Sequence, residues 1–568
     1  MQRVAIIGSG PTGIYTLKGL VEGRVPTAIT VFEESPDPGK GTPYHPAMND
    51  VVMLANIASI EIPRIVDTLH EWLGSLSDAR LDELGLKREE LGEREFYPRV
   101  VLGEYFESQF RSLVDLGRKA GHEIDMRGRT RVIDISLRAD FITVASRGPQ
   151  AEPSEERFDH VVMATGHDWP EETETSPGFF ISPWPAAAIK RVGAVRVGIL
   201  GTSLSGIDAA VTVAAAHGRF DDEDGVLVYR PRPDSGGLRI TMMSRKGLLP
   251  EADFYCPIPY DSCRHCTREA VDGLVDEGSD GLLDRLFELF RKELLDADPQ
   301  YATEIDLASA TVEDIADRYF RNRYDADPFV WAERNLEEAK RNKVGRITVK
   351  WRYALLRMHE NLARAVPHLN VADLERFHRH FKTVFVDDYA TVPHQSIERL
   401  LALHCAEVLD VWALGADYDV RREPIAGGAT VAAGDDERRF EAFIDATGRN
   451  SADAPDLPFP SLLKPGLVEE AKTEVSEETG ATKATGGIEV DEHFRPIVDR
   501  NVCTNLYCIS IPFLLHKLPF VQGITSARDM AEVAAAAIVS DVNERNGVRV
   551  EEKAPEVGEN NPLAEVLS

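Results

Sequence analysis

Two stretches of this chain, VAIIGSGPTGIYTLKGL at residues 4–20 and VRVGILGTSLSGIDAAVTVAAA at residues 195–216, share one pattern. In each, an apolar run leads into a turn of small residues, and apolar residues at helical spacing follow. A buried strand, a glycine-rich turn and a helix in this order begin a dinucleotide-binding unit. The sequence therefore predicts an α/β chain with two Rossmann-like units.

The first unit carries the complete GxGxxG spacing. Its first glycine permits a tight turn, the second lets the backbone approach a pyrophosphate, and the third lets the helix pack closely on the strand. The N–H groups that open the helix favour phosphate. A second apolar run at 28–32 ends in Glu33, where an acid is expected to bind a ribose hydroxyl. The predicted turn residues are Gly8, Gly10, Pro11, Thr12 and Gly13.

The second unit departs from the motif, because Ser203 stands where the middle glycine is expected. The next apolar run, 238–243, ends in a hydroxyl and two cations instead of the acid that an NAD site would carry. A guanidinium forms forked, charge-assisted contacts with phosphate, so this strand end favours NADPH over NADH. A solvated basic turn is the alternative. The predicted residues are Gly201, Ser203, Ser205, Gly206, Ser244, Arg245 and Lys246.

Each unit also has a closing strand of its own. The apolar runs at 157–166 and 440–450 both lead into Ala-Thr-Gly. Small residues at a strand end let the backbone pass close to a cofactor. We therefore expect Thr165 and Gly166 to border the first nucleotide, and Thr447 and Gly448 the second.

With these motifs the chain resembles the two-dinucleotide-binding flavoproteins, and more narrowly the flavoproteins related to class B flavin monooxygenases and to amine and amino-acid N-hydroxylases. The resemblance covers most of residues 1–540. It implies FAD on the first unit, NADPH on the second and catalysis where the two meet. The segments that carry it, besides the two Ala-Thr-Gly strands, are GSGPTG (8–13), GKGTPYHP (39–46), LANIASIEIP (54–63), YPRVVLGEY (97–105), MSRKGLLP (243–250) and IPFLLHKLPFVQGITSARD (511–529).

The order of these segments predicts an interrupted first domain. The expected limits are an FAD-binding domain at 1–190, an NADPH-binding domain at 191–450 with a helical insertion at about 257–380, a return to the FAD-binding domain at 451–545, and a disordered acidic tail at 546–568. We expect short alternating strands at 123–147 and a surface linker at 466–486.

Two polar residues fall in the region that borders the flavin in the resembling family. Asn56 is expected to hydrogen-bond a flavin edge or an oxygen adduct. Arg99 is expected to contact the pyrophosphate or the ribityl chain, with a structural salt bridge as the equal alternative.

Four residues near the C-terminal helix are further candidates. His516 and Lys517 interrupt an apolar stretch, and buried polar groups are costly unless they are paired. We predict a catalytic role for both, in contact with the flavin or with a substrate carboxylate, and a contact with a backbone carbonyl is the alternative. Gln522 and Gly523 precede an Ala-rich helix whose N-terminus is expected to face the flavin and stabilise negative charge.

The sequence also bears on metals and redox-active thiols. Cys263 and Cys266 form a CxxC, which raises the alternative of a disulfide reductase. The pair lies far along the chain from both glycine turns, and zinc would need a second ligand pair. We expect ordinary free cysteines and no metal.

The overall charge limits the partners. Lys and Arg number 64 against 95 Asp and Glu, a net charge of −31, which repels nucleic acid and anionic membranes. The chain starts directly on a predicted strand and has no apolar run of membrane-spanning length, so we expect a cytoplasmic protein. Its oligomeric state stays open.

The preferred interpretation is an enzyme that uses FAD, NADPH and dioxygen to hydroxylate the nitrogen of a small amine or amino acid, with aspartate-like substrates as a lead. Two alternatives remain: an NADPH-dependent flavoprotein reductase that avoids oxygen, and a non-catalytic redox sensor.

Overall fold

The structure is a computed structural model that describes residues 1–149, 152–167, 170, 172–448, 451–464, 467–475, 481–498, 501–521 and 523–546. Its first sheet has the strand order β23-β7-β1-β2-β3, and all neighbouring strands are parallel. The apolar run at 4–7 lies in the middle of this sheet and is almost completely buried. The elements are β1 (Arg3–Ile7), α1 (Pro11–Glu22), β2 (Ala28–Phe32), β3 (Glu123–Arg127), β7 (His160–Met163) and β23 (Leu506–Cys508).

A second sheet has the order β14-β13-β10-β18-β9-β8 and is parallel from β14 to β9. The strands β8 and β9 come from the segment before residue 190, so part of the predicted first domain is hydrogen-bonded into the second sheet. The elements are β8 (Glu174–Ser176), β9 (Phe179–Phe180), β10 (Arg196–Leu200), α6 (Leu204–His217), β13 (Arg239–Ser244), β14 (Leu409–Ala413) and β18 (Ala442–Asp445).

The two sheets repeat one another position by position. In each, a central strand leads into the glycine turn, the closing strand lies on one side of it, and the two following strands lie on the other. A helix precedes the outermost of these, and a three-stranded antiparallel meander follows. The repeat therefore extends through the whole unit. The corresponding elements are α4 (Arg99–Lys119) with β4 (Arg131–Leu137), β5 (Ile142–Arg147) and β6 (Ser154–Phe158), and α15 (His394–Cys405) with β15 (Tyr418–Arg422), β16 (Ala429–Ala433) and β17 (Asp436–Phe440).

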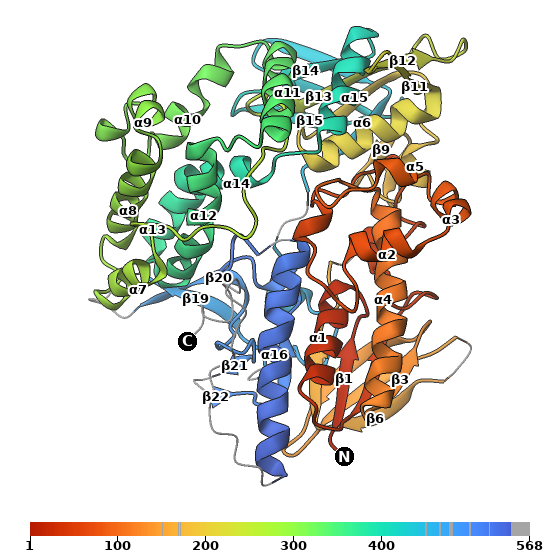
Figure 1. Cartoon of the computed structure of the whole chain (residues 1–568), viewed down its shortest axis with the longest axis vertical. Helices are drawn as coiled ribbons and strands as arrows, with labels where there is room; N and C mark the ends of the chain where they lie inside the picture. Colours follow the sequence, from red (N-terminus) through yellow and green to blue (C-terminus); the bar gives the residue numbers. More distant parts are fainter. Residues whose placement is uncertain are drawn as a thin grey trace.

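The C-terminal part of the chain returns to the first unit, as the segment order predicts. The strand β23 extends the first sheet, and α16 (Gly523–Arg545) lies along α1 (Figure 1). The two helices pack closely, because a Cβ on Gly19 of α1 would lie 2.6 Å from the Cβ of Ala535. The N-terminus of α16 is thereby brought to the end of the first sheet at which the glycine turn lies.

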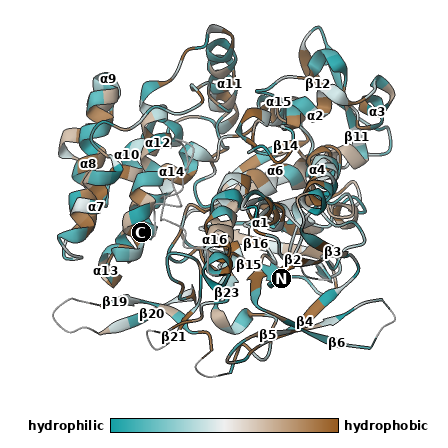
Figure 2. Cartoon of the chain, turned by 60° about the horizontal axis from the view of Figure 1, so that its bottom comes forward, coloured by the Kyte–Doolittle hydropathy of each residue, from teal (hydrophilic) through white to brown (hydrophobic). Residues whose placement is uncertain are grey.

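The helical insertion between β13 and α15 has a hydrophobic core of its own and stands to one side of the two sheets (Figure 1). Its apolar residues at 282–290 face this core. Its helices carry both apolar residues, in brown, and polar residues, in teal (Figure 2). The helices continue to Tyr389, beyond the predicted end at 380. They are α7 (Arg268–Asp276), α8 (Leu282–Ala297), α9 (Pro299–Glu304), α10 (Ile315–Tyr324), α11 (Pro328–Gly345), α12 (Lys350–Ala365), α13 (Val371–Arg376), a π-helical turn (Phe377–Phe381) and α14 (Lys382–Tyr389).

Two hairpins differ from the sequence-based expectations. The predicted linker at 466–486 contains the antiparallel strands β19 (Glu470–Glu474) and β20 (Thr482–Ile488), because Ala471 and Ile488 are buried against the core and fix the pairing. The hairpin of β11 (Gly218–Glu223) and β12 (Val226–Pro231) was not predicted, although Asp224-Gly225, both at positive φ, is a typical hairpin turn. The shorter elements are α2 (Leu69–Ser75), α3 (Asp78–Glu83), α5 (Ala186–Ile189), β21 (Ile497–Val498) and β22 (Asn501–Val502).

Two predictions fall on residues that the structure does not describe. Gln522 and the tail from residue 547 onward lie outside the described residues. Within the described part of the chain, every helix is too short or too polar to span a lipid bilayer.

Candidate functional site

The two glycine turns have the same geometry. Gly8 and Gly201 both adopt positive φ, +102° and +128°, and a Cβ on either would lie within 2.6 Å of the carbonyl oxygen of the alanine that follows the closing strand. The third glycines are equally confined: a Cβ on Gly13 would lie 2.1 Å from the Gly8 oxygen, and one on Gly206 would lie 2.3 Å from the Gly201 oxygen. Both turns are therefore held against their own helix and closing strand by contacts that only glycine permits.

Other glycines beside the turns are less confined. A Cβ on Gly10 would be in ordinary van der Waals contact with Gly41, at 3.4 Å. Gly166, Gly448 and Gly523 have positive φ, and a Cβ on any of them would meet nothing within 4 Å. Each confined turn therefore lies beside an open glycine that follows its closing strand, and this arrangement at the ends of parallel strands and at a helix N-terminus fits a dinucleotide pyrophosphate.

The acid at the end of β2 is fixed beside the first turn. Glu33 Oε2 accepts hydrogen bonds from the Ser9 backbone N–H at 3.0 Å and from its hydroxyl at 2.6 Å, and Oε1 accepts from the Ser35 N–H at 2.8 Å. The carboxylate thus stands at the edge of the cradle, where its ribose-binding role stays a prediction. At the closing strand, the Thr165 hydroxyl lies 2.6 Å from that of Ser510, which links β7 to the C-terminal segment.

The second cradle has its cations at the end of β13. Ser244 Oγ accepts hydrogen bonds from the Thr202 hydroxyl and the Gly247 N–H, both at 3.1 Å, so this hydroxyl closes the loop. The Arg245 side chain is exposed and makes no ion pair within the described part of the chain. The Thr447 hydroxyl donates to Asp445 at 2.7 Å.

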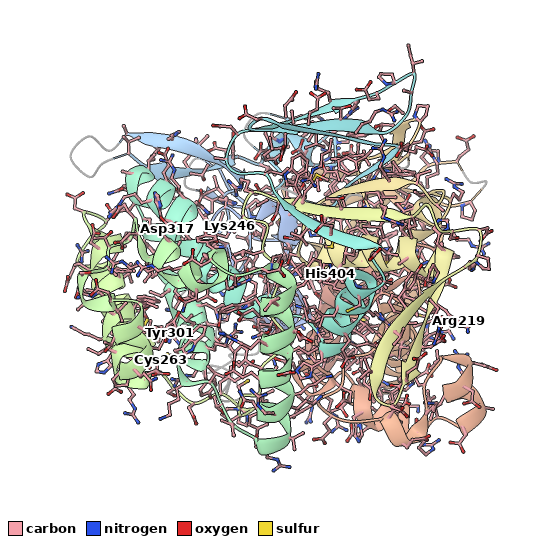
Figure 3. All side chains as sticks on the ribbon, turned by 90° about the horizontal axis from the view of Figure 1, so that it is seen from above. Arg219, Lys246, Cys263, Tyr301, Asp317 and His404 are labelled. Atoms are coloured by element: carbon pink, nitrogen blue, oxygen red, sulfur yellow. The ribbon has the colours of Figure 1, made fainter. Side chains whose placement is uncertain are left out.

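Lys246 points to the helical insertion. Its Nζ lies 3.5 Å from the centre of the Phe320 ring on α10, and burial lowers the pKa of its ammonium to about 8. Figure 3 shows Lys246 between the insertion and the second sheet. The phosphate-binding role predicted for Lys246 stays a prediction, but the observed contact is a cation–π interaction.

A narrow cleft separates the first unit from the helix of the second cradle. Its free volume is about 10 Å³, room for about one water molecule, and it lies between the loop at 54–56, the start of α4, the first turns of α6 and the start of α15. The Asn56 side-chain oxygen is buried there without a hydrogen-bond partner among the described residues. An unpaired buried acceptor calls for an explanation, and a donor from a bound cofactor or substrate would provide one.

Arg99 crosses this cleft. Its guanidinium forms an ion pair with Asp208 of α6 at 2.7 Å, and its Nε donates to the Leu54 carbonyl at 3.2 Å. Of the two roles considered for Arg99, the structure shows the salt bridge. Burial raises the pKa of Asp208 to about 6, against the lowering effect of Arg99 and Arg399. The pair joins the two units at the base of the second cradle.

An acid pair close to the cleft was missed. Asp253 follows β13 in a loop whose backbone pairs with Val392, a residue that lines the cleft. Burial, with a smaller contribution from the nearby Glu61, raises its pKa to about 7. Glu61, whose pKa burial also raises, accepts a hydrogen bond from Tyr260 at 3.2 Å. Residues with shifted pKa values gather at functional sites, but no local sequence pattern marks this pair.

His516 and Lys517 are held in a different place. The Lys517 ammonium pairs with Glu489 at the end of β20. The His516 ring is buried and lines a larger cavity between the insertion and β20. The described residues do not place either side chain at the cleft, so their catalytic roles stay predictions.

All six cysteines are free thiols. Cys263 and Cys266 lie in the core of the insertion, and burial raises the pKa of both thiols. The loop between them folds around the buried Glu293 carboxylate, which accepts hydrogen bonds from three successive backbone N–H groups. A group of potential metal ligands occurs at 491–493, but the Asp491 carboxylate already binds Arg495 at 2.7 Å.

The comparisons with known proteins agree with this geometry. A family model described as FAD-NAD(P)-binding matches residues 5–168, and a model described as YdhS-like middle domain matches residues 267–389, the insertion. The protein therefore binds FAD and NAD(P), and it has the α/β fold of flavin-dependent oxidoreductases.

Solved structures align over most of the chain at low scores. Ornithine N-hydroxylase from Kutzneria sp. 744 is 14% identical with a TM-score of 0.47, and the match covers 96% of this chain and 100% of that one. Bacillithiol disulfide reductase from Bacillus cereus is 11% identical with a TM-score of 0.42, over 95% and 99% of the two chains. Both an oxygenating enzyme and a reductase thus align, and at these scores neither decides the reaction.

One curated relative is much more similar. The protein YdhS of Escherichia coli (strain K12), whose function is uncharacterized, is 41% identical over 541 residues, which is 95% of this chain and 98% of the relative. By this identity over nearly the whole of both sequences, the chain belongs to the YdhS family of FAD–NAD(P)-binding proteins.

Proposed function

We propose that this protein is an FAD-dependent monooxygenase that takes its electrons from NADPH and hydroxylates the nitrogen of a small amine or amino acid. The observation that carries the proposal is the pair of equivalent cradles, each with a confined glycine turn and an open glycine after its closing strand, joined across one cleft by Arg99 and Asp208. An NADPH-dependent reductase would need the same two cradles, so the experiment below separates the two.

The residues of the chain divide the work between two cofactors. The turn at 8–13 and Glu33 would hold FAD, and the turn at 201–206 with Ser244 and Arg245 would hold NADPH through its 2′-phosphate. When bound, these cofactors supply two-electron reduction and, with dioxygen, an oxygenating flavin. The protein's part is to bind both, to bring their reactive rings together and to exclude water.

Asp253 is the group that we propose to accept the substrate proton. An amine attacks as a nucleophile only when it is neutral, so its ammonium form must lose a proton first. A carboxylate whose pKa is raised to about 7 is a stronger base than an ordinary aspartate. An ammonium group between Asp253 and Glu61 would also relieve the repulsion between the two carboxylates.

The cysteines favour the monooxygenase over one kind of reductase. A reductase that relays electrons through a dithiol needs an accessible, low-pKa pair. Here the CxxC thiols are buried in the insertion and their pKa is raised.

The test is NADPH oxidation by the FAD-loaded protein, screened over amines and amino acids in air and under argon, with peroxide and product measured together. We expect at least one amine to increase NADPH use in air and to yield a product heavier by one oxygen, in proportion to the NADPH consumed. Peroxide that matches NADPH for every amine would reject oxygenation and favour the reductase.

The proton acceptor has a test of its own. With the substrate so found, D253N is expected to shift the rising limb of the rate profile toward higher pH, because the amine must then lose its proton to solvent. The matched control D261N changes an exposed aspartate of the same loop and should leave the profile in place. A profile unchanged by D253N would exclude Asp253 as the acceptor.

A further inference from the structure

A second cavity is separate from the interdomain cleft. It has a volume of about 460 Å³ and lies between the insertion and the C-terminal hairpin. One wall is α13 with the π-helical turn, and the other is β20 with the segment that carries His516. Val371, Leu374 and Ala484 give it an apolar lining. Its size and its mixture of apolar and polar walls are typical of a pocket for a small organic molecule.

His516 is the buried polar group of this cavity. The residue is 7% exposed, and neither ring nitrogen has a hydrogen bond of good geometry within the described part of the chain. Its ring fits against β20 only because Gly487 lacks a side chain: a Cβ there would lie 2.0 Å from Nδ1. Burial and the nearby Lys517 lower the pKa of the imidazole to about 3, so the ring is neutral near pH 7 and offers one N–H donor.

The charged groups of the walls are Arg379, Lys483 and Glu375, two cations and one carboxylate. Arg379 is exposed and makes no ion pair with any described residue. Lys483 pairs with Glu375 at 3.1 Å, but both side chains are 59% exposed, so this pair contributes little and opens readily. The whole chain has a net charge of −31, whereas Arg379 and Lys483 on the facing walls give the cavity a local positive charge.

The backbone of the insertion is irregular at this cavity. Residues Phe377–Phe381 form a π-helical turn between α13 and α14. Phe377 and Phe381 point into the core of the insertion, whereas His378 and Arg379 line the cavity. Single π-helical turns inside α-helices occur frequently at functional sites, because the extra residue redirects side chains.

From these observations we infer that the cavity is a binding site for a small organic acid. Its carboxylate would lie against Arg379 and Lys483, and its apolar body against Val371, Leu374 and Ala484. This inference does not rest on the proposed function, since the binding requires neither NADPH nor turnover.

The test is calorimetric titration of the FAD-loaded protein with hexanoate, and separately with inorganic phosphate, in the absence of NADPH. We expect saturable hexanoate binding at one site per chain. R379Q should weaken it about tenfold or more, the usual effect of losing one charge-assisted contact. E375Q should tighten it several-fold, because Lys483 is then released to the ligand.

The gain in affinity with E375Q cannot be produced by misfolding, and retained FAD shows that the first cradle of each variant is intact. The matched control R341Q removes an exposed arginine of α11 that does not line the cavity, and should bind hexanoate like the unmodified protein. The inference is overturned if hexanoate does not bind, if only phosphate binds, or if R379Q and E375Q leave its affinity unchanged.

Discussion

The equivalence of the two cradles can be tested with one substitution made twice. In G13A the new Cβ would lie 2.1 Å from the Gly8 oxygen, and in G206A it would lie 2.3 Å from the Gly201 oxygen. An ordinary contact begins at about 3.4 Å, so the helix and the turn must separate by about 1 Å in either variant. Overpacking of this kind costs about 1–3 kcal/mol. The loss falls on the helix N-terminus that is expected to bind the pyrophosphate.

The two variants should fail differently. G13A is expected to lose FAD affinity by about tenfold or more, measured by titrating the apoprotein with FAD. G206A should retain FAD but show a comparable loss of NADPH affinity. The control G74A lies in α2, where a Cβ meets nothing within 4 Å, and should leave both affinities unchanged. If G13A keeps its full FAD affinity, or if G206A loses FAD and not NADPH, the assignment of the cradles is wrong.

Three further predictions follow from single groups. R245A should raise the KM for NADPH about tenfold or more and leave the KM for NADH nearly unchanged, because only NADPH carries the 2′-phosphate. The measurement is steady-state kinetics with both coenzymes, and an equal rise of both KM values would show that Arg245 has only a structural role. The pKa of Asp208 is raised to about 6, so between about pH 4 and about pH 6 the folded protein keeps a proton that the unfolded chain releases. The free energy of unfolding therefore falls as the pH rises through this range, by on the order of 3 kcal/mol in total. D208N should therefore reduce the difference in thermal midpoint between about pH 4.5 and about pH 7.5, and an unchanged difference would contradict the shift. Cys405, the exposed cysteine, should react rapidly with a thiol reagent while Cys263 and Cys266 stay protected until unfolding, and rapid labelling of more than one thiol in C405S would show that the insertion opens.

Much of the fold follows from local sequence patterns. The strand, turn and helix of each cradle depend on neighbouring residues, because a glycine turn of positive φ and the apolar periodicity around it are local properties. The elements at 3–32 and at 196–217 therefore lie where the sequence predicts them. The return of the C-terminal segment to the first unit was also predicted, although from the resemblance to a family and not from periodicity.

Local patterns did not predict strand pairing partners. The strands β8 and β9 are too short to be recognised, and they join the second sheet because β18 has a free edge there. The hairpin of β19 and β20 is polar in sequence, and only its contact with the core beneath Ala471 and Ile488 makes it a structured element. Strand pairing depends on what lies across the sheet, which no local pattern states.

The sequence by itself determined that this protein has two dinucleotide cradles, because the conformations that they require are encoded in a few adjacent residues. Only the tertiary structure decided what lies between and beside them: the pairing of Arg99 with Asp208, the shifted carboxyls near the cleft, and the cavity that brings His516 to Arg379. These residues are far apart in the chain, and their charges, burial and pKa values arise only when folding removes water from between them.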